Sequence, residues 1–204
     1  MREEEKLLQG LVAMPRNPDL VALRHSCHML CQEYNKTFED ETEHRAVLLH
    51  RILGFAGRAV LVQGPLFMSY GTHTSFGDNV RADYDLLVKD EANVTVGSRV
   101  ILGPRCSLIT SEYPMASDER MLETEATGVH ISPCRARPIT IGDDVWLEAC
   151  VTVMGGVTIG KGSVIAAGSV VTEDIPEGVF AGGVPCRVIR PITDSDRWLE
   201  PQGV

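Results

Sequence analysis

The stretch from Ile139 to Ile175 reads ITIGDDVWLEACVTVMGGVTIGKGSVIAAGSVVTEDI. Every sixth residue in it is aliphatic, which gives one column made of Ile141, Leu147, Val153, Ile159, Ile165 and Val171. An α-helix cannot use a period of six, because 3.6 residues per turn would spread this column around its surface. Simple strand alternation does not single out every sixth residue either. The period is typical of a chain folded around a prism, in which three sixes complete a coil and the aliphatic column points inward.

The same period extends toward the N-terminus. A second column in the opening stretch is small or β-branched and consists of Val145, Val151, Val157, Ser163, Ser169 and Ile175. Earlier in the chain the inward column is expected at Phe76, Ala82 and Val88 and, after a slip of two residues, at Val96, Leu102 and Leu108. The sequence therefore predicts a mainly β fold, a parallel β-helix over residues 59–192.

Three segments lie outside this pattern. Residues 1–58 have helical character, with a short helix from Glu3, a second that Asn17 caps, and a third from about Asp40 to Leu53. The expected apolar stripe of the third helix is Ala46, Val47, Leu49, His50 and Leu53. Residues 112–137 are charged and have no apolar column, so we expect an irregular functional loop there. Residues 193–204 are expected to form a surface tail.

Composition limits the choice of partners and compartment. The 204 residues have a net charge of −9 and no basic block, so nucleic acid and anionic membrane are poor candidate partners. No run approaches 18 apolar residues, and the first ten residues are too acidic for a signal peptide, so we expect a cytoplasmic protein. The six cysteines are expected to be free thiols, and because no His/Cys set has zinc-site spacing, no metal is expected.

The hexad column and the closing segment GGVPCRVIRPI (182–192) resemble hexapeptide-repeat acyltransferases of the sugar O-acetyltransferase branch, which contains the maltose and galactoside acetyltransferases. The helical segment resembles the same branch through Asn17-Pro18-Asp19-Leu20 and Tyr34-Asn35. This resemblance implies a left-handed parallel β-helix, assembled as a homotrimer with active sites between subunits. It also implies that the N-terminal helices cap the acceptor site, and that acetyl-CoA is the acetyl donor.

Acetyl transfer to a hydroxyl needs a base, and the resemblance fails at that position. The family's catalytic His-Pro pair is matched by Tyr113-Pro114, and a phenol with a pKa near ~10 is a poor base at neutral pH. Tyr113 is therefore expected to bind substrate, to donate a hydrogen bond, or to act as a base only if its pKa is strongly depressed. The polar residue that assists the family's His matches Asp85, whereas its acceptor-contacting Asp matches Met14.

Two other residues could replace the missing base. His130 lies in the 112–137 segment and could enter the cleft, but we favour the alternative that it is an exposed loop histidine. Glu148 stands where the family has glycine and could form a carboxylate cluster with Asp85 and Glu112. Such a cluster would raise one carboxyl pKa into a range useful for acid–base catalysis. The alternative for Glu148 is a solvated acidic corner residue.

The sequence matches the family's pattern more closely at the acetyl-CoA site than at the position of the base. Residues at positions that line the family's CoA channel are Trp146, Ala149, Ala167, Thr172, Arg187 and Arg190. The two arginines could bind the nucleotide phosphates by charge-assisted hydrogen bonds. The family's lysine after Thr172 is Glu173 here, and this reversed charge should weaken the binding of a polyphosphate. Glu148 could also narrow the channel.

Three functions follow from these residues. The first is an acetyl-CoA-dependent O-acetyltransferase acting on a hydroxyl of a sugar or other small molecule. The second is a CoA-independent isomerase, cyclase or dehydratase on the same fold, with Tyr113, Asp85, Glu148 or His130 as acid and base. The third is a non-catalytic trimeric scaffold. We rank them in that order, because the resemblance spans roughly residues 5–192.

Overall fold

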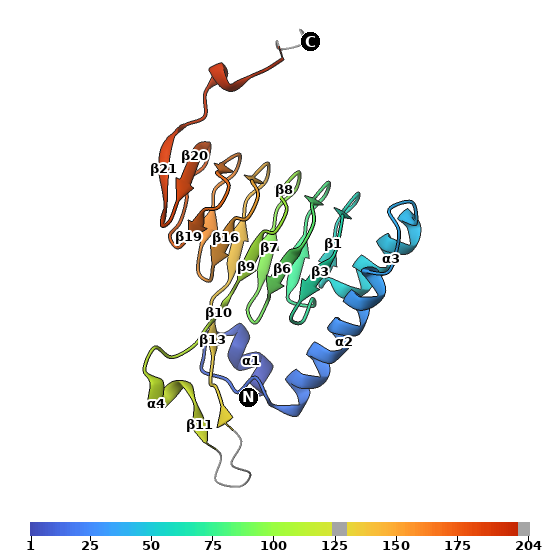
Figure 1. Cartoon of the computed structure of the whole chain (residues 1–204), viewed down its shortest axis with the longest axis vertical. Coiled ribbons are helices and arrows are strands. Elements are labelled where there is room, and N and C mark those ends of the chain that lie inside the picture. The colour runs from blue at the N-terminus through green and yellow to red at the C-terminus, as the bar shows by residue number, and fades with distance from the viewer. Residues whose placement is uncertain (124–129, 200–204) are drawn as a thin grey trace.

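The computed structural model describes residues 1–123 and 130–199. The chain forms a stack of β-helix coils with helices along one side, and residues 112–123 and 130–137 project from the stack (Figure 1). The helices are α1 (Glu3–Leu8), α2 (Pro18–Tyr34), α3 (Thr42–Ile52), the short α4 (Ser117–Arg120) and the 3₁₀ helix η1 (Asp194–Asp196).

Three parallel sheets form the faces of the prism. The first sheet contains β1 (Phe55–Ala56), β4 (Thr74–Phe76), β7 (Val94–Val96), β14 (Ile139–Ile141) and β17 (Thr158–Ile159). The second contains β2 (Leu61–Val62), β5 (Arg81–Ala82), β8 (Ile101–Leu102), β15 (Trp146–Leu147), β18 (Val164–Ile165), β20 (Val179–Gly183) and, antiparallel to β20, β21 (Cys186–Pro191). The third contains β3 (Leu66–Met68), β6 (Leu86–Lys89), β9 (Ser107–Ile109), β16 (Thr152–Met154) and β19 (Val170–Val171).

The predicted hexad column is confirmed as the core of the stack. Its residues are at most 2% exposed: Phe76, Ala82, Val88, Val96, Leu102, Leu108, Ile141, Leu147, Val153, Ile159, Ile165 and Val171. The parallel register places each directly over its counterpart in the next coil, as in the pairing of Leu102 with Leu147 and of Leu147 with Ile165. The two-residue slip and the 112–137 segment are thus tolerated, because the chain resumes the same inward column after each.

The corner between the second and third sheets has a repeated backbone conformation. Asp85, Arg105 and Cys150 occupy it with φ of 59°, 59° and 61°, and Gly168 follows with 71°. Backbone hydrogen bonds link the successive coils here, for example from Arg105 N to the Tyr84 carbonyl at 2.7 Å. A left-handed φ is costly for residues with a Cβ, so the stacked hydrogen bonds must hold these three in place.

The N-terminal helices pack on the coils as the sequence predicts. The Asn17 side chain caps α2 by accepting a hydrogen bond from Asp19 N, with Pro18 in the first turn. At the other end of α2, the Asn35 side chain both donates to the Leu66 carbonyl and accepts from Leu66 N, at 3.0 and 2.7 Å. This pair of bonds fixes α2 to the edge of the third sheet.

The predicted stripe of α3 is partly wrong. Leu49 and the following Leu53 are buried, but Val47 is 57% exposed and Ala46 and His50 are exposed as well. The buried face of α3 is instead made of Arg45, Leu48, Leu49 and Ile52. The reason is Arg45, a charged residue at a core position, whose guanidinium donates to the Val62 and Gln63 carbonyls and to the Tyr34 hydroxyl.

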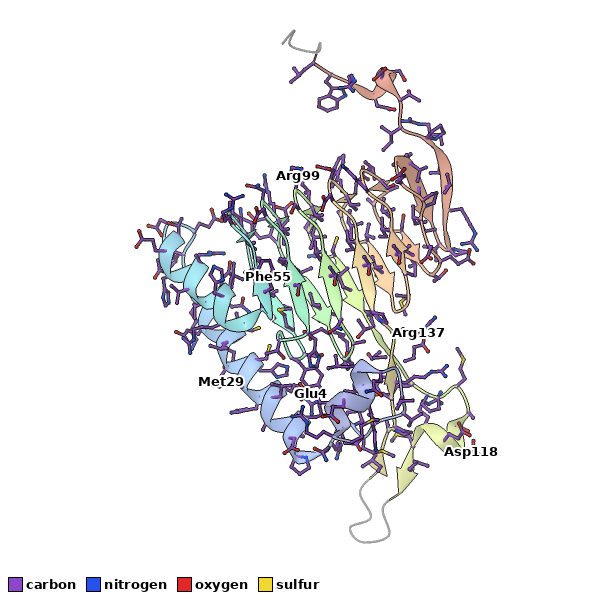
Figure 2. All side chains as sticks on the ribbon, turned by 180° about the vertical axis from the view of Figure 1, so that it is seen from behind. Glu4, Met29, Phe55, Arg99, Asp118 and Arg137 are labelled. Carbon is purple, nitrogen blue, oxygen red and sulfur yellow. The ribbon has the colours of Figure 1, made fainter. Side chains whose placement is uncertain are left out.

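The 112–137 segment is more regular than the predicted loop. β10 (Ser111–Glu112) pairs antiparallel with β13 (Arg135–Ala136), and β11 (Leu122–Glu123) pairs antiparallel with β12 (His130–Ile131). Its hydrophobic signal is weak because each strand has only two residues. Figure 2 shows Asp118, on α4, at the side of this arm and away from the stacked coils. We call the segment the hairpin arm.

The C-terminal segment leads away from the last coil after β21 (Figure 1). Its first turn is ordered by a two-bond contact from the Arg190 guanidinium to the Asp196 carboxylate, at 2.6 and 2.8 Å. The predicted surface tail over 193–204 therefore begins with η1, and residues 200–204 lie outside the described part of the chain.

Candidate functional site

A pocket of about 600 Å³ lies between α2 and the third sheet. Its walls come from the α1–α2 linker, α2, β3 and β6 with the residues that follow them, and the hairpin arm. The lining residues are Pro15, Arg16, Arg24, His28, Phe67, Met68, Ser69, Leu87, Lys89, Glu91, Tyr113, Met121 and Ser132. We call it the helix–sheet pocket. Its concave shape and mixed polar and apolar lining suit a small molecule.

A buried carboxylate lines this pocket. Glu91 is 6% exposed, and its Oε1 lies 3.1 Å from the Ser69 hydroxyl and 3.3 Å from Lys89 Nζ. Its Oε2 is buried and has no hydrogen-bond partner among the described residues. A carboxylate oxygen in such a position is costly unless a ligand or proton satisfies it. Glu91 is therefore the carboxylate in the pocket that can accept a proton from a bound hydroxyl, and His28 on α2 is the imidazole that lines the same pocket.

The backbone around Glu91 is held by its neighbour Asp90. The Asp90 carboxylate accepts hydrogen bonds from Tyr70 N at 2.8 Å and from the Thr74 hydroxyl at 2.9 Å. Asp90 is fully buried, and this burial raises the pKa of its carboxyl group. Asp90 faces away from the pocket's lining and serves to fix the turn that presents Lys89 and Glu91.

Arg24 on α2 is held in the pocket by uncharged groups. Its guanidinium donates to the Pro15 carbonyl at 3.3 Å and to the Tyr70 hydroxyl at 3.2 Å. Burial raises the pKa of Tyr70 to about 12, so this hydroxyl stays neutral. The Arg24 side chain is thus fixed in position while its charge has no carboxylate partner among the described residues.

Tyr113 follows β10 and lines the pocket with 45% of its surface exposed. Burial of the phenol raises its pKa, with Glu91 adding to the effect and Lys89 opposing it. The phenol is therefore protonated at neutral pH. The expectation that a depressed pKa could make Tyr113 a base is wrong, because desolvation favours the neutral form. The remaining predicted roles, substrate contact and hydrogen-bond donation, fit its place in the pocket.

The other predicted acid–base residues lie elsewhere. Asp85, at the corner between the second and third sheets, has its Oδ2 at 3.6 Å from Arg105 Nε. Glu148, near the same corner two coils on, accepts a hydrogen bond from Ala167 N at 2.9 Å. Glu112 pairs with two arginines of the hairpin arm, Arg135 and Arg137.

Within one chain, the predicted carboxylate cluster is therefore not formed. Asp85, Glu112 and Glu148 each have a separate partner. His130 begins β12, where its backbone pairs with Glu123 next to the undescribed residues 124–129.

The predicted donor-site residues line the far half of the coil stack. Trp146 is on the outer face of the second sheet, 44% exposed, while Ala149 and Ala167 occupy the adjacent corner. Thr172 directly follows β19 and is exposed. A row of this kind, open along one edge, could hold an extended ligand.

Both candidate phosphate-binding arginines have carboxylate partners in this structure. Arg187 Nη2 lies 3.2 Å from Glu173 Oε1, and Arg190 forms its paired contact with Asp196. The reversed charge at Glu173 thus acts directly on a predicted donor-site residue. A bound polyphosphate would have to compete with Glu173 for Arg187.

Sequence analysis missed Ser69, Lys89, Glu91 and Arg24. The signal that could have revealed two of them is the run Lys89-Asp90-Glu91, which places three charges at the end of the strand β6 and directly after it. Arg24 was hidden among exposed polar residues of an amphipathic helix, and only the packing of α2 on the third sheet brings it to Tyr70.

In the described ranges, 1–123 and 130–199, no group of three or more His, Cys, Asp or Glu side chains could hold a metal ion. None of the helices in those ranges is both long and apolar enough to cross a membrane.

Comparison with known proteins identifies two family matches. Residues 138–173 match the family described as "Bacterial transferase hexapeptide (six repeats)". Residues 6–57 match the "Maltose acetyltransferase hexapeptide capping motif". The two matches coincide with the hexad stretch and with the helices that pack on the coils.

The chain is also similar to individual proteins over most of its length. It is 39% identical to galactoside O-acetyltransferase of Escherichia coli over 168 residues, covering 82% of this chain and 78% of that protein. A galactoside acetyltransferase solved with coenzyme A superimposes with a TM-score of 0.88, at 34% identity over 100% of this chain and 98% of that one. A hexapeptide-repeat acetyltransferase of Vibrio cholerae, solved with acetyl-CoA, gives 0.82 at 31% identity over 95% and 100%.

Proposed function

The chain belongs to the hexapeptide-repeat acetyltransferases, in the sugar O-acetyltransferase branch, and from this premise we propose how its residues divide the work of acetyl transfer. It is an acetyl-CoA-dependent O-acetyltransferase that acts on a hydroxyl of a small molecule, with a left-handed parallel β-helix fold. The acceptor binds in the helix–sheet pocket. The observation that carries this assignment is the presence of Tyr113 and the buried Glu91 in one pocket.

In the reaction, the acceptor oxygen attacks the thioester carbonyl carbon while its proton passes to the Glu91 carboxylate. The tetrahedral intermediate then collapses, the carbon–sulfur bond breaks, and the CoA sulfur takes the proton from Glu91. The protonated Tyr113 donates a hydrogen bond to the thioester carbonyl oxygen, which becomes negatively charged in the tetrahedral intermediate. A carboxylate is a weaker base than imidazole, so turnover should be slower than with histidine.

Acetyl-CoA lies along the coil edge formed by the donor-site residues: Trp146, Ala149, Ala167, Thr172, Arg187 and Arg190. Arg187 and Arg190 bind its phosphates, and the exposed Trp146 and the small corner side chains leave room for the pantetheine arm. Glu148 lies at the same corner as Ala149 and accepts a hydrogen bond from Ala167 N. Its side chain therefore narrows the proposed binding path of the pantetheine arm. This assignment is supported by the exposure of the row and by the CoA complexes of the relatives.

The active unit is a homotrimer with sites between subunits. Support comes from the outer face of the second sheet, where Leu61, Ile101 and Trp146 are 60%, 42% and 44% exposed. Ile101 pairs in register with Trp146, so these two side chains form an exposed apolar pair that suits a protein–protein contact, while Arg81 lies between Ile101 and Leu61. A neighbouring subunit could bring the Asp85 and Glu148 corner to the helix–sheet pocket, which one chain alone does not do. Light scattering on the purified protein would give the subunit number directly.

The protein resides in the cytoplasm. The six cysteines are all free in the structure, including Cys27 and Cys31, whose sulfurs are 4.0 Å apart in the core. Free thiols at this density fit a reducing compartment.

The test of this mechanism is thiol release from acetyl-CoA by the Glu91→Gln and Tyr113→Phe variants. Loss of a general base should lower kcat by about 10²–10⁴-fold in Glu91→Gln, with unchanged acetyl-CoA binding. Tyr113→Phe should lower kcat by roughly tenfold, the effect of about 1.4 kcal/mol for one lost hydrogen bond.

Glu33→Gln, on the exposed face of α2, is the matched control and should behave as wild type. If Glu91→Gln keeps full turnover, Glu91 is not the base. The same assay on Asp85→Asn, Glu148→Gln and His130→Gln would then identify which of the sequence-predicted candidates is.

A further inference from the structure

We propose that the acceptor carries an anionic group, a carboxylate or a phosphate, which Arg24 and Lys89 bind in the helix–sheet pocket. This inference rests on the proposed function and names the chemical class of its acceptor. A neutral sugar would leave the charge of Arg24 without an anionic partner among the described residues.

The charge of the pocket is opposite to that of the chain. Its lining contains three cationic side chains, Arg16, Arg24 and Lys89, and one carboxylate, Glu91. The pocket thus has a positive excess, in a protein whose net charge is −9. Clefts lined by one sign of charge concentrate ligands of the opposite sign, because the low-dielectric walls focus the field.

Arg24 is the main anion-binding group. Its two terminal nitrogens are held by the Pro15 carbonyl and the Tyr70 hydroxyl, and its guanidinium lies 5.9 Å from the centre of the Tyr70 ring. These partners orient the guanidinium but leave its positive charge uncompensated. A planar guanidinium fixed in this way suits carboxylate or phosphate, since it can donate two parallel hydrogen bonds without further loss of side-chain freedom.

Lys89 and Arg16 have supporting parts. Lys89 Nζ is 3.3 Å from Glu91 Oε1 and keeps about a third of its side chain exposed, so it can contact an anion while its charge is partly offset by Glu91. Arg16 is exposed at the pocket's edge and would contribute to long-range attraction.

The proposed catalytic residues, Tyr113 and Glu91, lie in the same pocket as the proposed anion-binding residues. Arg24, Lys89, Glu91 and Tyr113 all line this one pocket. An acceptor whose anionic group contacts Arg24 would therefore share the pocket with Tyr113, and its free hydroxyl could reach Glu91. The expected acceptor is a small hydroxylated anion, such as a sugar acid or sugar phosphate.

The experiment compares three acceptors, D-galactose, D-galacturonate and galactose 1-phosphate. Calorimetry measures their binding, and thiol release from acetyl-CoA measures their turnover. At least one of the two anions should bind about 10–100-fold more tightly than galactose, because charge-assisted hydrogen bonds are about twice as strong as neutral ones. The preference should fall as ionic strength rises. Comparing the binding of galacturonate with that of galactose 1-phosphate shows whether the site prefers a carboxylate or a phosphate.

Variants assign the preference to the pocket. Arg24→Gln should abolish it, and Lys89→Gln should reduce it and provides a second test if Arg24→Gln fails to fold. Arg51→Gln, which removes an exposed charge from α3, should leave it unchanged. Equal binding of galactose and both anions, or a preference that survives both pocket variants, would overturn the inference.

The outcomes also separate this inference from the proposed function. Efficient acetylation of galactose with no gain for either anion refutes the anionic acceptor and leaves acetyl transfer intact. Arg24-dependent anion binding without thiol release from acetyl-CoA supports the anion site and refutes the proposed function.

Discussion

Replacing Glu173 by lysine should strengthen acetyl-CoA binding. In the structure the Glu173 carboxylate is 3.2 Å from Arg187 Nη2, next to Thr172 in the proposed donor site. The side chains are 66% and 54% exposed, so the ion pair itself contributes no more than about 1 kcal/mol. Its effect on a bound polyphosphate is larger, because Glu173 both occupies Arg187 and repels the ligand.

The size of the gain follows from these two contributions. Removing the repulsion and freeing Arg187 should give roughly 0.5–1 kcal/mol at an exposed site, and the new ammonium group a similar amount. Together they make acetyl-CoA binding about 5–30-fold tighter in Glu173→Lys. Glu173→Gln, which only removes the charge, should give about 2–5-fold.

The assay is calorimetric titration with acetyl-CoA at low and high salt. The gain should shrink toward wild type in roughly 0.5 M NaCl, since exposed charges are screened. Glu177→Lys makes the same change of charge at an exposed position without an ion pair in the described structure, and should have little effect. Equal affinity of wild type and Glu173→Lys, or an equal gain in Glu177→Lys, would refute the placement of the phosphates beside Arg187.

Three further predictions concern the core, the phenol and the helix cap. Leu147→Ala, at a fully buried column position, should lower the free energy of unfolding by about 3–5 kcal/mol in urea titration; a loss below about 1 kcal/mol would contradict the stacked core. Because the pKa of Tyr113 is raised above about 10, thiol release should show no ionisation step from it between about pH 7 and 9; a step there that Tyr113→Phe removes would disprove this. Asn35→Ala, which breaks two hydrogen bonds to Leu66, should lower the free energy of unfolding by roughly 1–3 kcal/mol in the same urea titration. An unchanged midpoint would show that these two hydrogen bonds do not stabilise the fold.

The fold could be read from the sequence because the β-helix repeats one local rule. A buried apolar residue recurs at every sixth position within each of three runs, Phe76 to Val88, Val96 to Leu108 and Ile141 to Val171. This spacing fixes the coil, and no long-range contact has to be guessed. The rule fails where packing partners are distant in sequence. The buried face of α3 differs from the predicted stripe because Arg45 is buried, where it donates hydrogen bonds to the Val62 and Gln63 carbonyls. From the sequence alone, a charged residue is expected to be exposed.

The site was harder to predict for the same reason. Matching Tyr113 to the family's catalytic position pointed to a residue that lines the proposed acceptor pocket, but its protonation depends on burial and on the charges of Glu91 and Lys89. Those two residues come from β6 and the turn after it, two coils before the predicted donor row. The arginines on β21 were found from the closing motif, but their pairing with Glu173 and Asp196 needed the structure.

The most direct test of the account is the stoichiometry of acetyl transfer. Purified protein is incubated with acetyl-CoA and each hydroxylated acceptor, and free thiol and acetylated product are measured together, the product by mass spectrometry. The account predicts one acetylated acceptor for each thiol released, with both signals lost in Glu91→Gln. Absence of acetyl-CoA binding and of thiol release with every acceptor would contradict it and would favour CoA-independent acid–base chemistry on the same fold.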